Sequence, residues 1–291
     1  MVRRPWKMTA LFLLLTGGAF PVRAQEPAEP EIGEVVVTAT RTPEPAGAGT
    51  KSVTVITAEE IHSKQIQSVA EALRGVPGAT IVQTGTLGGQ TSTFLRGSNS
   101  NHTLFLIDGV PINTPTDGAF DLADLSIENV ERIEVVRGPQ STLYGSSAMG
   151  GVVNVITKRG AGPPSHRLSV GAGKHSTFRE VFASAGGTER ADYSITAVRL
   201  DSQGRGEHDE YANTNLSARL GVKPTPTTRL EVFSRFVEAD KDLPPVLGRQ
   251  DISTGAAFDP DQNQQREFLQ VGTAWSQSLT PEWDYRLILA R

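Results

Sequence analysis

Residues 92–158 constrain the fold most, because short apolar runs alternate there with turns marked by glycine. Residues 104–107 precede Asp108-Gly109, and residues 133–136 precede Gly138-Pro139. Runs of β-branched and aromatic residues bounded by Gly, Pro and Asp are typical of strands joined by tight corners. This stretch therefore predicts a small, well-packed sheet domain.

Two short helices are predicted before this stretch. Thr57 with Glu60, and Ser68 with Glu71, each fit the S/T-x-x-E pattern in which a hydroxyl and a carboxylate cap the first turn. Gly75 is a typical helix end. The second helix should bury one apolar stripe, formed by Val69, Ala72 and Leu73.

The first 24 residues resemble a targeting segment. A basic start with Arg3, Arg4 and Lys7 precedes the uncharged apolar residues 8–20, and the small-x-small tripeptide 22–24 follows. This is the pattern of a secretory signal peptide cut after Ala24, and it predicts export through the Sec pathway. The alternative is a membrane anchor, but the apolar run is shorter than the ~20 residues that a spanning helix needs.

Residues 25–50 read as a flexible arm, rich in Pro, Ala and Glu, with one strand-forming patch at residues 35–37. Such a patch can add as an extra strand to the sheet edge of a partner protein. An ordinary first strand is the alternative.

Residues 161–291 alternate between apolar and polar side chains in segments of about ten residues. We expect strands near residues 167–173, 178–186, 191–200, 213–222, 228–238, 267–277 and 283–291. Either a transmembrane β-barrel or a soluble antiparallel sandwich shows this alternation. Connections that are short at one end and long at the other favour the barrel.

The last predicted strand runs into Arg291 without a turn, and about seven strands is an odd and small number for a bacterial barrel. We therefore expect residues 161–291 to be a partial β-barrel. Either the chain is an N-terminal fragment of a larger protein, which we favour, or the protein itself is cut short.

Composition argues against several other classes. The net charge of -4 disfavours a nucleic-acid partner, and the absence of Cys excludes thiol chemistry. Residues 171–176 lack the glycine spacing of a phosphate loop, and the five His show no zinc-protease spacing. We expect no catalytic site, no metal-ligating site residues and no cofactor, so the chain is not predicted to be an enzyme.

Several motifs in fixed order carry a family resemblance. They are E-V-V-V-T-A in the arm, F-L-R-G, L-I-D-G-V, V-E-R-I-E-V-V-R-G-P and L-Y-G-S-S-A-M-G-G-V-V-N-V-I-T. Together they resemble the plug domain of TonB-dependent outer-membrane receptors. The implied fold is an α+β plug domain, residues 51–160, followed by the first strands of an antiparallel transmembrane β-barrel.

The resemblance implies active uptake across the outer membrane of a Gram-negative bacterium, in contact with outer-membrane lipid. Within the family, R-G-S-N-S-N-H-T-L-F-L-I-D-G-V-P-I-N is most similar to the vitamin B12 (cobalamin) receptors. Receptors for ferric siderophores or haem are the alternative, and a soluble periplasmic β-rich binding protein or enzyme is the alternative of another class.

The resemblance also assigns a partner to the arm. Residues 34–39 look like the TonB box, which pairs with TonB by strand addition, in agreement with the strand-forming patch. Its predicted TonB-binding residues are Glu34, Val35, Val36, Val37, Thr38 and Ala39.

Two plug loops should face the substrate. Their glycines let the backbone approach a ligand, and their hydroxyl and amide groups offer hydrogen bonds. The predicted substrate-binding residues are Thr84, Gly85, Gly89, Gln90, Thr91, Ser92, Asn113, Asp117 and Gly118.

Arg96 and Arg137 stand where the family places plug arginines that lock onto barrel glutamates. The family's partners lie beyond Arg291, and Glu134 is the nearest candidate partner within the plug. Some cobalamin receptors hold calcium in extracellular loops. Calcium is possible in the acidic loops here, at Asp201, Glu207, Asp209, Glu210, Asp240, Asp242, Asp251, Asp259 and Asp261.

Overall fold

The computed structural model describes residues 36–37, 44–45, 52–206, 208–243, 263–280 and 283–291. The predicted signal peptide, and the predicted arm apart from two short strands, lie outside the described residues. Those strands, β1 (Val36–Val37) and β2 (Glu44–Pro45), pair antiparallel with each other.

The first domain is built around a five-stranded sheet with the order β3-β8-β9-β6-β7. Neighbouring strands are antiparallel except β6 and β9, which are parallel. The sheet strands are β3 (Ser52–Thr57), β6 (Thr103–Ile107), β7 (Val110–Pro111), β8 (Val130–Arg137) and β9 (Gly151–Thr157). A separate hairpin consists of β4 (Ala79–Gln83) and β5 (Thr91–Leu95).

Both predicted helix caps are confirmed. α1 (Ala58–Ser63) begins after Thr57, and α2 (Val69–Arg74) begins after Ser68. The hydroxyl of each cap accepts a hydrogen bond from the backbone N–H three residues later. Three shorter helices are η1 (Ser100–His102), α3 (Ser141–Tyr144) and η2 (Ser146–Ala148).

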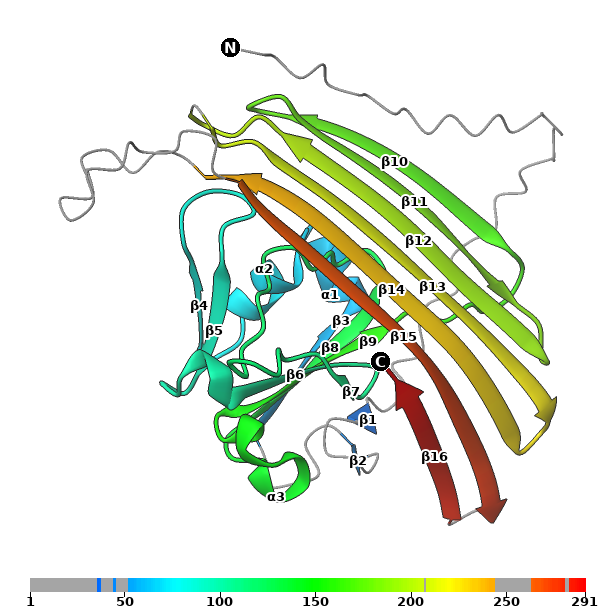
Figure 1. Cartoon of the computed structure of the whole chain (residues 1–291). Helices are drawn as coiled ribbons and strands as arrows, with labels where there is room; N and C mark the ends of the chain where they lie inside the picture. The colour runs from blue at the N-terminus through cyan, green and yellow to red at the C-terminus, as the bar shows by residue number, and fades with distance from the viewer. Residues whose placement is uncertain (1–35, 38–43, 46–51, 207, 244–262, 281–282) are drawn as a thin grey trace, which may run out of the picture. The chain divides into compact units, whose positions relative to one another are not determined.

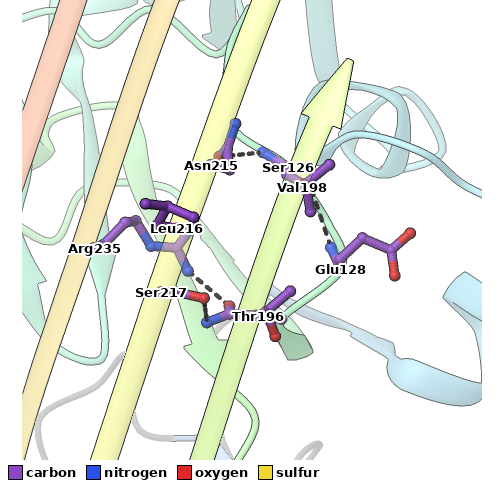
Figure 2. A pocket seen from close by; sticks show the side chains of 9 residues that line it. Ser126, Glu128, Thr196, Val198, Asn215, Leu216, Ser217 and Arg235 are labelled. Atoms are coloured by element: carbon purple, nitrogen blue, oxygen red, sulfur yellow. Dashed lines mark hydrogen bonds between the residues drawn. The ribbon is translucent and has the colours of Figure 1, made fainter. Parts of the chain in front are cut away.

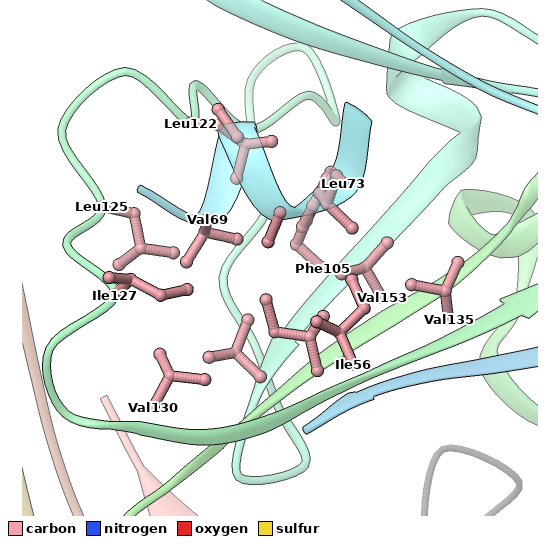
Figure 3. Close-up of a cluster of buried hydrophobic side chains, with 14 of the residues drawn as sticks. Ile56, Val69, Leu73, Phe105, Leu122, Leu125, Ile127, Val130, Val135 and Val153 are labelled. Carbon is pink, nitrogen blue, oxygen red and sulfur yellow. The ribbon is translucent and has the colours of Figure 1, made fainter. Parts of the chain in front are cut away.

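The core of this domain lies between α2 and the sheet. Figure 3 shows Val69 and Leu73 pointing from α2 toward Phe105 and Val153 of the strands. All four side chains are almost completely buried, as is the predicted Ala72. The predicted apolar stripe of the second helix is thus confirmed. None of the described helices is both long and apolar enough to cross a membrane.

The remaining described strands form a seven-stranded antiparallel sheet in chain order (Figure 1). They are β10 (Ser165–Gly173), β11 (Thr177–Gly187), β12 (Ala191–Ser202), β13 (Tyr211–Thr225), β14 (Thr228–Asp242), β15 (Asn263–Thr280) and β16 (Trp283–Ala290). Each predicted strand matches one of these, with ends that differ by a few residues.

The two faces of this sheet are opposite in character to those of a soluble sandwich. On β13, Leu216 and Leu220 are 45% and 57% exposed, whereas Asn215 and Arg219, which directly precede them, are 7% and 3% exposed. A sandwich buries its apolar face, but these strands bury the polar face and expose the apolar one. That is the arrangement of a transmembrane barrel, whose apolar face meets lipid.

Candidate functional site: the plug and its contacts with the barrel strands

Asp108 is the centre of one buried contact between the plug and the strands. It lies in the tight turn between β6 and β7 with φ of 53°, and its carboxylate accepts hydrogen bonds from Thr157 N (3.0 Å) and Oγ1 (2.7 Å). The same carboxylate forms an ion pair with Arg219 of β13, whose Nη2 also donates to Thr157 Oγ1 (2.8 Å). Plug and strand are therefore joined by a charged group that is hydrogen-bonded on both sides.

Glu231 of β14 continues this contact. Its buried carboxylate lies 3.1–3.5 Å from the guanidinium nitrogens of four arginines: Arg159, Arg219, Arg229 and Arg286. Arg159 belongs to the segment that links plug and sheet, and the other three arginines belong to β13, β14 and β16. One carboxylate thus connects three strands with the end of the plug.

Glu128 makes a second ionic contact. Its two carboxylate oxygens pair with Arg167 Nη2 (2.6 Å) and Arg179 Nη2 (2.7 Å), on β10 and β11. The carboxylate therefore bridges the first two strands of the sheet, and charge-assisted bonds of this length are among the stronger hydrogen bonds in proteins.

A third contact joins the plug to β15. Arg266 Nε lies 2.7 Å from Asp124 Oδ2, its Nη1 donates to Asp121 Oδ2 (3.2 Å), and Tyr211 OH donates to Asp124 Oδ1 (2.8 Å). Burial raises the pKa of the Asp124 carboxyl, although Arg266 and Tyr211 oppose the shift. Arg266 and Tyr211 thus favour the charged form of a carboxylate that is only 11% exposed.

The first predicted substrate loop connects β4 and β5. Thr84 N donates to Gln90 O (2.9 Å) and closes the loop, while Thr84, Gly85 and Gln90 are exposed. Thr91, in contrast, is 2% exposed, and its N donates to Asp121 Oδ1 (2.8 Å). Thr91 therefore anchors the loop, while substrate binding by the exposed Thr84, Gly85 and Gln90 stays a prediction.

The same loop is tied to the strands. Thr86 Oγ1 hydrogen-bonds to Asp209, which is paired with Lys241 of β14, and Lys241 Nζ also donates to Thr86 Oγ1 (3.0 Å). Burial opposes ionisation of Asp209, but hydrogen bonds from Lys241, Thr86 and Arg205 N outweigh it and lower its pKa. Gly88 O accepts from Arg266 Nη2. Of the predicted residues, Gly89 and Ser92 are partly exposed within this anchored loop and β5.

The second predicted loop uses its polar groups internally. Asn113 Oδ1 accepts from Phe105 N (2.7 Å), and its Nδ2 donates to Thr103 O (2.9 Å) and Gly118 O (2.8 Å). Asp117 accepts hydrogen bonds from Thr114 Oγ1 and from Ala119 N (3.0 Å), and these bonds lower its pKa. Asn113 and Asp117 therefore shape the loop, and their roles in substrate binding stay predictions.

The predicted lock arginines lie close together. Arg137 Nη1 donates to Pro77 O (2.9 Å), Arg96 N donates to Gly78 O (2.7 Å), and a Cβ on Gly138 would lie 3.1 Å from Arg96 Nη1. Glu134 is completely buried and pairs with Arg132 Nε (2.9 Å), which shares its face of β8. The pairing of Arg96 and Arg137 with later barrel glutamates stays a prediction.

The plug carboxylates Asp108, Asp121, Asp124 and Glu128 were not predicted from the sequence as contacts with the strands. The dipeptide Asp108-Gly109 already fits a tight turn, so the sequence gives no reason to expect an ion-pair partner for Asp108. No local pattern pairs an Asp with an Arg on a distant strand. The sequence feature that could have revealed these contacts is arginine on the polar face of the alternating strands, as at residues 167, 179 and 219. Buried arginine needs a carboxylate, and the plug is the surface that the polar face meets.

The calcium prediction concerns loops that are only partly described. Among the described residues, no three His, Asp or Glu side chains are grouped to hold a metal ion. Asp209 does not suit calcium, because Lys241 already occupies its carboxylate. Residues 207, 251, 259 and 261, and all of the TonB box except Val36 and Val37, lie outside the described residues.

Comparisons with known proteins show what this chain is similar to. Residues 46–152 match the family model described as TonB-dependent Receptor Plug Domain. The vitamin B12 transporter BtuB of Photobacterium profundum is 29% identical over 251 residues, which cover 83% of this chain and 41% of the relative. The chain thus spans about two fifths of the length of this curated relative.

Solved receptor structures share the fold. The ferripyoverdine receptor FpvA of P. aeruginosa superposes with a TM-score of 0.73 at 20% identity, over 87% of this chain and 35% of that one. The ferric yersiniabactin uptake receptor FyuA of Yersinia pestis gives 0.69 at 22% identity, over 84% and 40%. Residues 46–152 therefore match the plug domain of TonB-dependent receptors, and the strands β10–β16 that follow resemble the start of the barrel of these receptors.

Proposed function

We propose that this chain belongs to an outer-membrane receptor that takes up vitamin B12 actively, with energy supplied through TonB. The observation that carries the proposal is the polar contact between plug and strands. A plug held to a barrel by ion pairs closes the barrel firmly, but the same polar groups can exchange partners with water when the plug is moved.

The proposed cycle assigns roles to the predicted segments. After export directed by residues 1–24, the TonB box at residues 34–39 reaches TonB in the periplasm, where it adds as a strand to the TonB sheet. Substrate binds at the loops around Gly85 and Gly118. Pulling on the arm then separates plug carboxylates from strand arginines and opens a path.

Vitamin B12 is the proposed substrate because the curated relative at 29% identity is named as a vitamin B12 transporter. A ferric siderophore is the second candidate, because receptors such as FyuA share the fold at a TM-score of 0.69. Substrate specificity depends on loops that differ on a common scaffold, so the fold alone does not distinguish vitamin B12 from a ferric siderophore.

Binding to whole cells tests the substrate. Cells that lack their own cobalamin and siderophore receptors would express the full-length protein, and labelled cobalamin and labelled ferric siderophores would be added separately. Saturable cobalamin binding above that of vector-only cells is expected. Saturable siderophore binding without cobalamin binding would replace the first candidate with the second.

A further inference from the structure

A small cavity lies between the plug and the polar face of β12, β13 and β14. Its volume is about 10 Å³, and its wall includes Thr196, Ser217 and Arg235 from the three strands and Asn129 from the plug. Figure 2 shows Arg235 and Thr196 facing the same space from either side of Ser217. The space suits one water molecule or one monatomic ion.

Arg235 is a buried cation without a carboxylate partner among the described residues. Its side chain is 5% exposed, and of its five N–H donors only Nη2 has a recorded hydrogen bond, to Asn129 Oδ1 (2.7 Å). Its situation differs from that of Arg219 and Lys241, the other buried cations of these strands, which are paired with Asp108 and Asp209.

The carboxylates nearest in the plug are already engaged. Glu128 lines the cavity, but its two oxygens bind Arg167 and Arg179. Asp108 binds Arg219 and Thr157. On the two neighbouring strands, the register partners of Arg235 are Ser217 of β13 and Gln270 of β15, and neither carries a charge.

The side-chain amide of Gln270 also lacks a hydrogen-bond acceptor in the described part of the chain. It is 3% exposed, and its Nε2 is buried with no hydrogen-bond partner among the described residues. As the register partner of Arg235 on an antiparallel pair, its side chain emerges on the same face. A second buried donor without an acceptor in the described ranges therefore lies on the strand next to Arg235, although Gln270 does not line the cavity itself.

We propose that this cavity binds a monatomic anion, chloride in ordinary salt, as the counter-ion of Arg235. The Asp108 carboxylate attracts the Arg235 guanidinium from a distance, but it is paired directly with Arg219. Water in the cavity would satisfy some donors without adding a negative charge of its own. The hydroxyls of Ser217 and Thr196 can complete the donor set. The site does not depend on which substrate the receptor carries.

Bromide replacement tests the site directly. The full-length receptor would be crystallised in sodium bromide, and anomalous scattering would be measured at the bromine edge. A peak within hydrogen-bond distance of Arg235 is expected, and it should vanish in Arg235→Met. No peak in the wild-type cavity, or an undiminished peak in the variant, would overturn the proposal.

A solution measurement covers the case in which Arg235→Met does not fold. Thermal unfolding of the wild type would be compared in sodium bromide and sodium gluconate at equal ionic strength. A midpoint higher by roughly 1–3 °C in bromide is expected, as for a ligand that binds only the folded state. Arg190→Gln, at an exposed turn, should keep the shift, and Arg235→Gln should lose it. Equal midpoints in the two salts for the wild type would contradict an anion site.

Discussion

Asp108 of the plug and Arg219 of β13 form an ion pair whose side chains are only 6% and 4% exposed. The pair shows how this plug is held in the described part of the chain. At Asp108, Asp124 and Glu128 the plug supplies the carboxylate and a strand supplies the arginine, whereas at Glu231 the strand supplies the carboxylate. Contacts of this kind give orientation as well as attachment, because each buried charge tolerates few alternative partners.

Asp108→Asn should destabilise the full-length receptor by about 3–5 kcal/mol, because the neutral amide no longer compensates the buried charge of Arg219 at this contact. The loss in the free energy of unfolding would be measured by titration with denaturant, with protease cleavage of the plug as the readout of unfolding. Asp201→Asn is the matched control, because Asp201 pairs with Arg199 at the surface and should cost less than about 1 kcal/mol. Equal losses in the two variants would refute the structural role of the Asp108 pair.

Gly88→Ala should displace the first substrate loop. A Cβ at Gly88 would overlap the ring of Tyr211, whereas a Cβ at Gly85 meets nothing within 4 Å. Both residues have positive φ, 77° and 74°, so backbone strain is the same in the two variants. Gly88→Ala should therefore cost about 1–3 kcal/mol more than Gly85→Ala.

Denaturant unfolding and whole-cell ligand binding would compare these two variants. We expect the larger loss of stability and of affinity in Gly88→Ala. Similar behaviour of the two variants would show that the loop does not rest against Tyr211.

Asp117 should make the second loop sensitive to acid. Hydrogen bonds from Thr114 and Ala119 lower the pKa of Asp117 below 3.8. Because the folded pKa lies below the unfolded value, its contribution to loop stability is present above about pH 4 and is lost as the pH falls through the lowered pKa. Carbon-13 NMR of labelled Asp would follow the titration.

The Thr114→Val variant provides the control for this titration. It removes the first of these hydrogen bonds, so the Asp117 midpoint should move up toward 3.8. A midpoint that is unchanged in Thr114→Val would mean that this bond does not form in solution.

The secondary structure could be predicted largely from the sequence, because its signals are local. The hydroxyls of Thr57 and Ser68 cap helices within three residues. The strands show apolar and polar alternation residue by residue. That alternation gives Leu220 and Arg219 opposite faces, but it does not say which face is buried, so barrel and sandwich could not be separated by periodicity alone.

The contacts of the site could be predicted less well, because they join distant parts of the chain. Asp108 fits a turn pattern that is complete without Arg219. Asn113 belongs to a loop expected to meet substrate, but its amide holds the loop itself by three hydrogen bonds. A polar side chain in a loop can bind a ligand or the backbone, and the sequence gives the same signal for both.

The measurement that tests the central claim most directly is uptake after removal of the TonB box. The full-length receptor lacking residues 34–39 would be compared with the intact receptor for cobalamin binding at the cell surface and for cobalamin accumulation inside the cell. We predict unchanged surface binding and loss of TonB-dependent accumulation, because the deletion removes the proposed site of pulling and leaves the plug closed. Accumulation that survives the deletion at the intact level would contradict the account.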